Sequence, residues 1–217
     1  ALVRGQSGTV VYNGIAGPAS AEPSDYDGSR KLRLLLPGRF NRIKGQDVLV
    51  EAITLLSPEQ RARLEVRLIG GVFENDTATR DRVVELIEQH GLHDCVKMED
   101  FQKDISGAYA ATDVVVVPSQ RPEPLGRVAI EGMAYAKPVI VSNIGGLPET
   151  VENGVSGWYV EAGDAVGLAR RIADLLDHPE WVRSFGLAAR ERYERVFLME
   201  TVDAQTRAYL AREFGGA

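Results

Sequence analysis

A run of four valines, Val114 to Val117, leads through a proline-rich loop into a helix and then into a second apolar segment. Three prolines between Pro118 and Pro124 prevent regular structure in the loop, and the helix is expected to begin near Gly126. Lys137-Pro138 ends that helix. The segment therefore predicts a strand, a rigid loop, a helix and a strand, the unit from which parallel sheets are built.

The same alternation extends over most of the chain. Strands are expected at 32–36, 64–69, 96–98, 114–117, 138–142 and 157–160. Helices or helical turns are expected at 46–56, 57–59, 76–90, 104–111, 126–136, 164–176, 179–195 and 199–212. Strands that are apolar on both faces indicate a parallel sheet covered by helices on both sides. Right-handed crossovers then predict an α/β fold: a Rossmann-like, doubly wound, six-stranded parallel sheet that ends in long helices.

The first 31 residues lack this pattern. Thr9 to Tyr12 is expected to form a short strand, and Asn13-Gly14 is a turn signal. Residues 16–30 are rich in glycine, proline, serine and aspartate, which is typical of a linker or a mobile loop.

Composition excludes several classes of protein. A net charge of −6 and a pI near 5.2 argue against a general nucleic-acid binder. The single cysteine, Cys95, cannot form an intrachain disulfide and is expected to be a small core residue. No apolar run reaches the ~18 residues of a membrane-spanning helix. The chain begins at Ala1 without a methionine or a signal-like stretch, and we interpret it as a piece of something longer.

In an open α/β sheet the ligand lies beyond the carboxyl ends of the strands. The loop after the first strong strand carries Gly38-Arg39 and Lys44-Gly45. Arginine and lysine suit phosphate oxygens, and glycines let the backbone approach a ligand closely. A surface turn with two solvated cations is an equally good interpretation of these residues alone. The Gly-x-Gly-x-x-Gly signature is absent, which disfavours NAD or FAD.

The helix after the proline-rich loop carries the strongest signal. The backbone N–H groups of Leu125, Gly126 and Arg127 lie at its N-terminus, where a pyrophosphate binds well. Glu131 follows about 7.5 Å further along the helix axis, roughly the reach from a pyrophosphate to a nucleoside ribose. A carboxylate there can accept hydrogen bonds from the ribose hydroxyls. The alternative is an exposed helical glutamate, against which we expect a buried face at Ala129, Met133 and Ala136.

Two further loops are candidates for the same site. Gly145-Gly146, after the fifth strand, suits a tight turn near a ligand or an ordinary strand-to-helix turn. The loop from Met98 to Asp104 follows the third strand and could flank a base, with Phe101 beside it. A core position for Phe101 is the simpler interpretation.

Together these residues resemble a known family. Glu123 and Glu131, within Pro-Glu-Pro-Leu-Gly-Arg-Val-Ala-Ile-Glu-Gly-Met-Ala, look like the E-x7-E signature of retaining GT-B glycosyltransferases, above all family 4, the glycosyl transferases group 1. Gly38-Arg39 with Lys44-Gly45 resembles that family's Gly-Arg…Lys-Gly segment. Residues 137–149 resemble the strand and Gly-Gly turn that follow, and residues 11–14 its interdomain linker.

The resemblance implies a role for each matching residue. Arg39 and Lys44 would hold the donor diphosphate, Glu131 the ribose, and Glu123 would lie beside the transferring sugar. Glu123, Arg39 and Lys44 are thereby the expected catalytic residues. The expected donor nucleotide-sugar site consists of Gly38, Arg39, Lys44, Met98, Phe101, Glu123, Leu125, Gly126, Arg127 and Glu131.

The resemblance also implies a domain organisation. Residues 1–31 would be interdomain linker and domain start, 32–195 the donor-binding Rossmann-like domain, and 196–217 a crossover helix toward an acceptor-binding domain that this chain lacks. The reaction would move a hexosyl group, with retention, from a UDP, GDP or ADP sugar to an acceptor hydroxyl in glycan or glycolipid synthesis. We expect no activity from this fragment alone, no cofactor or metal, and a cytoplasmic location. Association with the inner face of the membrane would come only through the absent domain.

The chain departs from the family pattern at three places. Gly70-Gly71-Val72-Phe73-Glu74 replaces a Gly-Asp-Gly-type turn, Asp100 precedes Phe101 where glycine is common, and Arg127 stands where an apolar residue or threonine is frequent.

Asp25-Tyr26-Asp27 also matches the metal-binding D-x-D of the other large glycosyltransferase class, but it lies in a linker-like loop, and we interpret it as a solvated turn. The alternatives are a nucleotide-binding module without turnover and a sugar-nucleotide epimerase or a glycan phosphorylase on the same fold.

Overall fold

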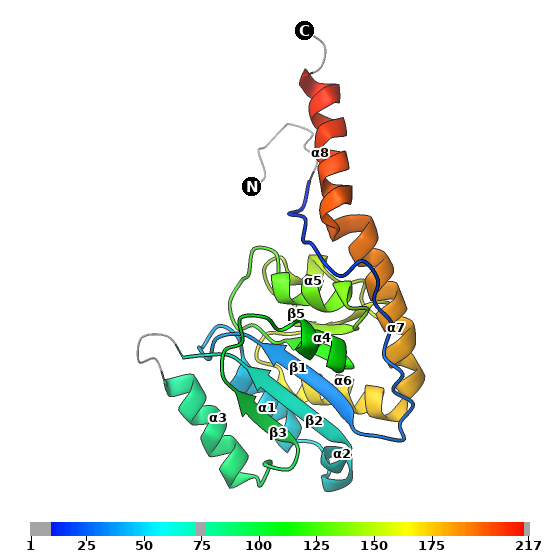
Figure 1. The fold of residues 1–217 in the computed structure, drawn as a ribbon. Helices are drawn as coiled ribbons and strands as arrows, with labels where there is room; N and C mark the ends of the chain where they lie inside the picture. The colour runs from blue at the N-terminus through cyan, green and yellow to red at the C-terminus, as the bar shows by residue number, and fades with distance from the viewer. Residues whose placement is uncertain (1–9, 73–76, 215–217) are drawn as a thin grey trace.

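Six parallel strands form one sheet in the order β3-β2-β1-β4-β5-β6 (Figure 1). The computed structural model describes residues 10–72 and 77–214. The strands are β1 (Leu32–Pro37), β2 (Leu64–Ile69), β3 (Val96–Glu99), β4 (Val114–Val117), β5 (Val139–Ser142) and β6 (Gly157–Val160). The order reverses between β1 and β4, which is the switch point of a doubly wound sheet and the usual place for a ligand.

Helices connect the strands and continue beyond the last one. They are α1 (Gln46–Thr54), α2 (Pro58–Ala62), α3 (Ala78–Gln89), α4 (Ser106–Ala111), α5 (Arg127–Ala134), the 3₁₀ turn η1 (Leu147–Glu149), α6 (Ala165–Asp177), α7 (Pro179–Arg192), the π turn η2 (Tyr193–Phe197) and α8 (Met199–Phe214). Apart from their ends, the α-helices are those that the sequence predicts, and the π turn η2 begins within the predicted helix at 179–195. The predicted start of the third helix at Asp76 lies outside the described residues.

Each central strand contributes to two separate cores. In β1, Leu34 and Leu36 pack into a cluster with α1, α3 and α6, whereas Leu35 packs into a cluster with α4, α5 and the end of α7. Val114 and Val115 of β4 divide in the same way. Because neighbouring side chains of a strand point to opposite faces, strands that are apolar throughout require helices on both faces. The predicted doubly wound fold is confirmed.

Residues 10–31 differ from their predicted state. No strand forms at Val10–Tyr12, and Thr9 lies outside the described residues; the ladder contact of this segment is instead a parallel bridge from Ile15 to Leu198. The predicted linker or mobile loop at 16–30 is wrong in one respect: the segment packs against the domain, and Ser24 and Tyr26 are buried. Irregular composition indicated the absence of regular structure, not the absence of tertiary contacts.

A buried carboxylate holds this segment to the sheet. The side chain of Asp113 is fully buried and accepts hydrogen bonds from Arg30 (2.7 and 3.0 Å), Arg33 (2.9 and 3.1 Å) and Ser24 Oγ (2.5 Å). Burial alone would raise the pKa of Asp113, but the two guanidinium groups and the hydroxyl together hold it far below its usual value. This residue therefore stays ionised and joins the N-terminal segment to the amino ends of the strands.

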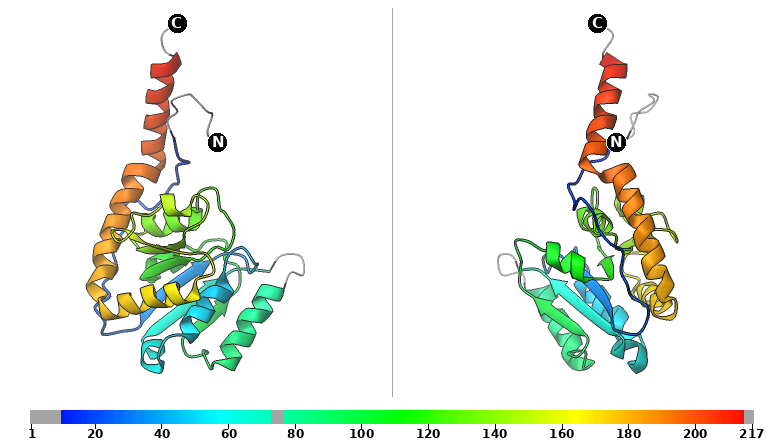
Figure 2. Two further views of the ribbon diagram at one scale, coloured as in Figure 1. Left: turned by 180° about the vertical axis from the view of Figure 1, so that it is seen from behind. Right: turned by 45° about the vertical axis from the view of Figure 1, so that its right-hand side comes forward.

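The last helices leave the body of the domain. Figures 1 and 2 show α7 lying along one side, followed by α8, which projects beyond the sheet with residues 10–16 beside its beginning. Between the two helices the π turn at Tyr193–Phe197 and the extended residue Leu198 change the direction of the chain. Tyr193 Oη donates to Ile15 O at 2.9 Å, and Ile15 N donates to Phe197 O at 2.8 Å. The predicted helix at 179–195 thus ends three residues earlier, at Arg192.

Candidate donor-binding site

The helix α5 begins at the carboxyl end of β4, as its sequence predicts. Gly126 caps it in the left-handed conformation, with φ 69° and ψ 53°, and a Cβ atom there would lie 2.5 Å from Leu147 Cδ2. Only glycine combines this backbone conformation with this close approach. The expected buried face is confirmed: Ala129, Met133 and Ala136 are each no more than 1% exposed. The N-terminus of α5, with its positive end, is thereby fixed against the neighbouring loop.

Three loops converge on Glu123. Lys44 Nζ, from the loop after β1, lies 2.8 Å from Glu123 Oε1, and the Ser119 hydroxyl donates to the same oxygen. From the loop after β5, Gly146 N donates to Glu123 O at 2.8 Å, and Gly145 forms a parallel bridge with Glu123. The side chain of Glu123 is 14% exposed and that of Lys44 is 23% exposed. The structure therefore brings three of the four predicted loops together at one residue, Glu123: Lys44 and Ser119 contact its carboxylate, and Gly145-Gly146 contacts its backbone.

Glu131 lies on the exposed side of α5 with both oxygens engaged. Tyr109 Oη of α4 donates to Glu131 Oε2 at 2.8 Å, and Arg127 contacts Oε1 at 3.4 Å. Burial and the Glu131 carboxylate raise the pKa of Tyr109 far above its usual value, so the hydroxyl keeps its proton and donates. The Tyr109 ring stacks on Tyr135 with centroids 5.4 Å apart. Sequence reasoning did not identify Tyr109, because its role depends on α4 and α5 packing side by side.

Lys44, Glu123 and Glu131 line one pocket of about 1130 Å³. The predicted site residues that line it are Lys44, Glu123, Leu125, Gly126, Arg127 and Glu131. Residues 11–16 form part of its wall, and Met199, Val202, Asp203 and Thr206 of α8 form another part. Sequence analysis did not predict that these two segments line the pocket, because the composition of a linker does not show which surface the linker covers.

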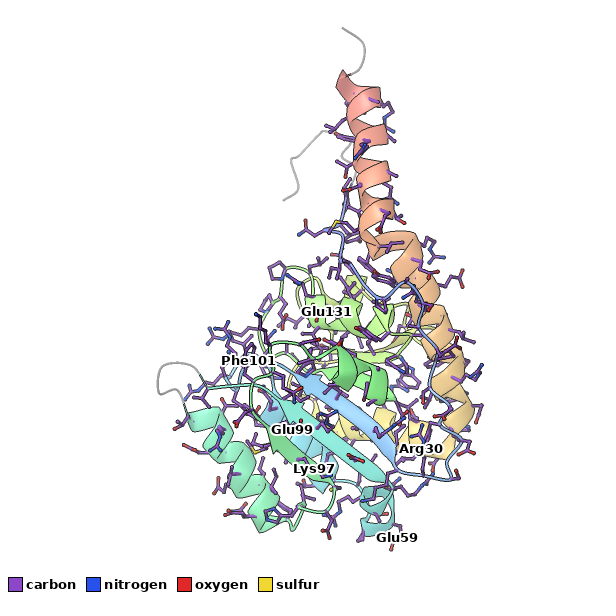
Figure 3. All side chains as sticks on the ribbon, in the orientation of Figure 1. Arg30, Glu59, Lys97, Glu99, Phe101 and Glu131 are labelled. Atoms are coloured by element: carbon purple, nitrogen blue, oxygen red, sulfur yellow. The ribbon has the colours of Figure 1, made fainter. Side chains whose placement is uncertain are left out.

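Four predicted residues do not line this pocket: Gly38, Arg39, Met98 and Phe101. The side chain of Met98 packs against the hydrophobic core on the α1 side of the sheet. Phe101 is 72% exposed, so the core interpretation of this residue is wrong; it lies two residues beyond β3, at the start of the following loop (Figure 3). Gly71, whose Cβ position would be 3.5 Å from Phe101 Cβ, is its neighbour from the loop after β2.

A second hollow, of about 540 Å³, opens on the other side of Glu131. Its lining includes Lys103, Ser106 and Tyr109 from the segment between β3 and the end of α4, together with residues 16–18. Glu131 lines both hollows and therefore stands between the N-terminus of α5 and the beginning of α4. Figure 3 shows Glu131 over α5.

The other candidate groups have structural partners. Asp25 pairs with Arg30 at 2.5 Å, and Asp27 accepts from Ser29, so the D-x-D segment is a hydrogen-bonded turn. Cys95 is buried, as predicted, and its thiol donates to Leu92 O. Within residues 10–72 and 77–214, no group of three or more histidine, cysteine, aspartate or glutamate side chains is arranged to hold a metal ion. Over the same residues, every helix is too short or too polar to cross a membrane.

Comparison with known proteins places this geometry in a family. The family model described as "Glycosyl transferases group 1" matches residues 27–192. The chain is 35% identical, over 161 residues, to a D-inositol 3-phosphate glycosyltransferase of Thermobispora bispora, and 31% identical, over 198 residues, to that of Streptomyces avermitilis. The alignments cover 72% and 85% of this chain but only 37% and 42% of those proteins, so the chain spans about two fifths of the length of these relatives.

Several solved structures are similar to this chain in fold. Anabaena HepE in complex with UDP superimposes with a TM-score of 0.78 at 27% identity, covering 85% of this chain and 50% of HepE. The sucrose-phosphate synthase of Thermosynechococcus elongatus gives a TM-score of 0.74 at 32% identity, covering 91% and 50%. The C-terminal domain of a group 1 glycosyl transferase, LpcC, from Francisella tularensis gives 0.68 at 22% identity and is itself covered to 86%. The chain therefore matches about half of the longer structures and most of an isolated C-terminal domain.

Proposed function

The chain belongs to the glycosyl transferases group 1 family, and on that premise we propose that it is the donor-binding half of a retaining glycosyltransferase. In this proposal it binds a nucleotide-diphosphate sugar and presents the hexosyl group to an acceptor held by a separate, preceding domain. Residues 32–195 form the donor domain, and the segments at 1–31 and 196–217 connect it to the acceptor domain. The cytoplasmic location, and any association with the inner face of the membrane, belong to this proposal for the whole protein.

The observation that supports it is the convergence of Lys44, Glu123 and Glu131 around the N-terminus of α5 in one pocket. A diphosphate placed at that N-terminus meets the positive end of the helix and the Lys44 ammonium. Glu131, held by Tyr109, is then a carboxylate of fixed orientation one and a half turns along the helix, suited to the two hydroxyls of a ribose. Leu125, Gly126 and Arg127 line the phosphate end of this pocket. Arg39, Met98 and Phe101 do not line it, and their assignment to the phosphate and the base rests on the family resemblance alone.

This arrangement suits transfer of a hexosyl group to a hydroxyl. The bond between the anomeric carbon and the phosphate oxygen breaks, the bond to the acceptor oxygen forms, and the proton of the acceptor hydroxyl passes to the departing diphosphate. Negative charge grows on the departing diphosphate, where Lys44, Arg39 and the helix N-terminus stabilise it by a few kcal/mol each, to order of magnitude. Glu123 lies beside the same lysine and would face the sugar at the phosphate end of the pocket.

The proposed ligand is taken from similar proteins whose structures contain nucleotides. The HepE structures contain UDP, UDP with glucose, and UDP-glucose, so we propose a nucleoside diphosphate of the UDP, GDP or ADP type as the ligand. Because the acceptor wall is not part of this chain, we expect binding without turnover from the chain alone. An epimerase on the same fold would instead act on the sugar nucleotide without any acceptor.

Titration calorimetry with UDP, GDP and ADP tests the proposal. We expect one of the three to bind, and expect Lys44→Ala and Glu131→Ala each to weaken that binding at least tenfold. Lys97→Ala on β3 and Glu88→Ala on α3 serve as matched controls, because they remove the same charges outside the pocket. Absence of binding to all three nucleotides, or unchanged binding in both pocket variants, would refute a donor site. Turnover of a sugar nucleotide by the unaided chain would refute the assignment as half of an enzyme.

A further inference from the structure

Gln46, the first residue of α1, is a polar side chain in the core. It is 0% exposed, although a buried amide is unfavourable unless its groups are hydrogen-bonded. Its Nε2 donates to two successive carbonyls, Gly38 O at 3.0 Å and Arg39 O at 2.9 Å. Gln46 thus joins the end of the loop after β1 to the beginning of that loop, across the residues from which Arg39 and Lys44 extend.

The same stretch of backbone is held from the opposite side. Gly38 N donates to Ile69 O at 2.8 Å, and Phe40 N donates to Gly71 O at 3.0 Å. The Gly38 carbonyl lies so close to Gly70 that a Cβ atom on Gly70 would be 2.0 Å from its oxygen. The beginning of the loop is therefore fixed between the end of β2 and the Gln46 amide.

The orientation of the Gln46 amide follows from its partners. Within the described residues, Gln46 Oε1 has no hydrogen-bond partner, whereas Nε2 serves two carbonyls. The reversed amide would place an oxygen against two carbonyl oxygens and is therefore excluded on electrostatic grounds. In a trans peptide the C=O and the N–H point in opposite directions, so holding both carbonyls toward Gln46 turns the following N–H groups away from it. The Phe40 N–H bond to Gly71 agrees with this.

We propose that Gln46 is a positioning residue for the donor diphosphate: its amide holds the Gly38–Arg39 backbone so that Arg39 and Lys44 are presented together. Gln46 does not touch the ligand. The inference rests on the proposed function, because it assumes that Arg39 and Lys44 bind phosphate. The contact between the loops supports it: Gln120 N donates to Ile43 O at 2.7 Å, and Lys44 reaches Glu123, so a shift of this loop would also move the ion pair.

Two substitutions separate this role from a general contribution to folding. Gln46→Leu keeps similar volume and removes both hydrogen bonds. Gln46→Glu replaces the amide N–H group with a carboxyl group, which can donate a hydrogen bond only when it is protonated. Burial against two carbonyls favours the protonated form. The charged neighbours along the chain are Lys44, Asp47 and Arg39, with Glu123 beside Lys44. These charged groups are present in both the variant and the wild type. The ratio of the two affinities at each pH therefore reports only the titration of the side chain at position 46.

The experiment measures the Kd of UDP, GDP and ADP for the wild type, both variants and Ile53→Ala at several pH values between about 5.5 and 8. Ile53 is fully buried in α1, two turns beyond Gln46, and its truncation lowers stability without touching the loop. All measurements are made well below each Tm. We expect Gln46→Leu to weaken binding about tenfold, as loss of two hydrogen bonds implies. Gln46→Glu should be weak at high pH and approach the wild type as the pH falls, and Ile53→Ala should bind like the wild type.

The outcomes distinguish the two proposals. Binding within twofold of the wild type in Gln46→Leu, or a pH-independent ratio for Gln46→Glu, overturns the positioning role while the donor site stands. A loss of affinity in Ile53→Ala equal to that in Gln46→Leu also overturns it, since stability would then explain both. Failure of the wild type to bind any of the three nucleotides refutes the proposed function, and this inference with it. If Gln46→Leu does not fold, the pH series on Gln46→Glu decides alone.

Discussion

The Lys44–Glu123 ion pair predicts that Glu123→Gln binds UDP more tightly than the wild type. In the structure Nζ and Oε1 lie 2.8 Å apart. The ammonium proposed to hold the diphosphate is therefore already shared with a carboxylate, and that carboxylate also repels the incoming anion. Glutamine keeps the shape and the acceptor for Ser119 but removes the charge.

The burial of the pair sets the expected magnitude. Two unit charges 4 Å apart interact by about 4 kcal/mol at an effective dielectric constant near 20. Exposed ion pairs are worth only about 0.2 to 1 kcal/mol. Lys44 and Glu123, at 23% and 14% exposure, lie between these limits. We expect a gain of about 1 to 2 kcal/mol, or about five- to thirtyfold in Kd.

Calorimetric titration with UDP at about pH 7.5 and about 0.15 M salt measures this gain, which should shrink as salt rises. UDP is used without a sugar, because a bound sugar would lose its own contact with Glu123. Glu191→Gln, on α7, is the control: it changes the net charge equally, and Glu191 is 78% exposed and outside the pocket. Lys44→Met should abolish the gain from Glu123→Gln. Weaker binding by Glu123→Gln, or an equal gain in the Lys44→Met background, would refute the reasoning.

Two further substitutions test other parts of the structure. Asp113→Asn should lower the free energy of unfolding in urea by about 2 to 3 kcal/mol, because Arg30 and Arg33 lose their buried partner. Since the folded-state pKa of Asp113 is depressed below 3.8, its stabilisation is complete above about pH 5 and is lost as the pH falls toward the folded-state pKa; a difference that persisted unchanged in acid would contradict the assignment. Tyr109→Phe should weaken nucleotide binding about fivefold, with little change in Tm, by removing the hydrogen bond that orients Glu131. Equal affinities would show that Glu131 needs no such support.

Local patterns were sufficient for most elements. Runs such as Val114–Val117 are apolar throughout, and strands of this kind are stable only between two helical layers, so the doubly wound sheet follows from the sequence. The start of α5 was predictable for the same kind of reason, because prolines and glycine restrict the backbone before any tertiary contact forms. Errors arose where the local sequence does not decide between a buried and an exposed position. A core position was the simpler interpretation of Phe101, the alternative to a place beside the base, but in the loop after β3 this residue is 72% exposed.

Contacts between distant segments could not be predicted. Tyr109 and Glu131 are 22 residues apart, and Lys44 and Glu123 are 79 apart. Both pairs depend on how the loops meet at the carboxyl ends of the strands. Residues 16–30 resemble a linker in composition, and their tertiary contacts, such as the ion pair of Arg30 with the buried Asp113, show that they are held in place.

The sequence by itself determined the fold class and the family, because strand and helix periodicity and the spacing of Glu123 and Glu131 are local properties of the chain. The tertiary structure alone decided which groups share a pocket: it joined Lys44 to Glu123, placed α8 and residues 11–16 opposite α5, and assigned the buried Gln46 amide to the loop that carries Arg39. The physical reason is that distance and burial, which determine the strength of charge and hydrogen-bond interactions, exist only once the chain has folded.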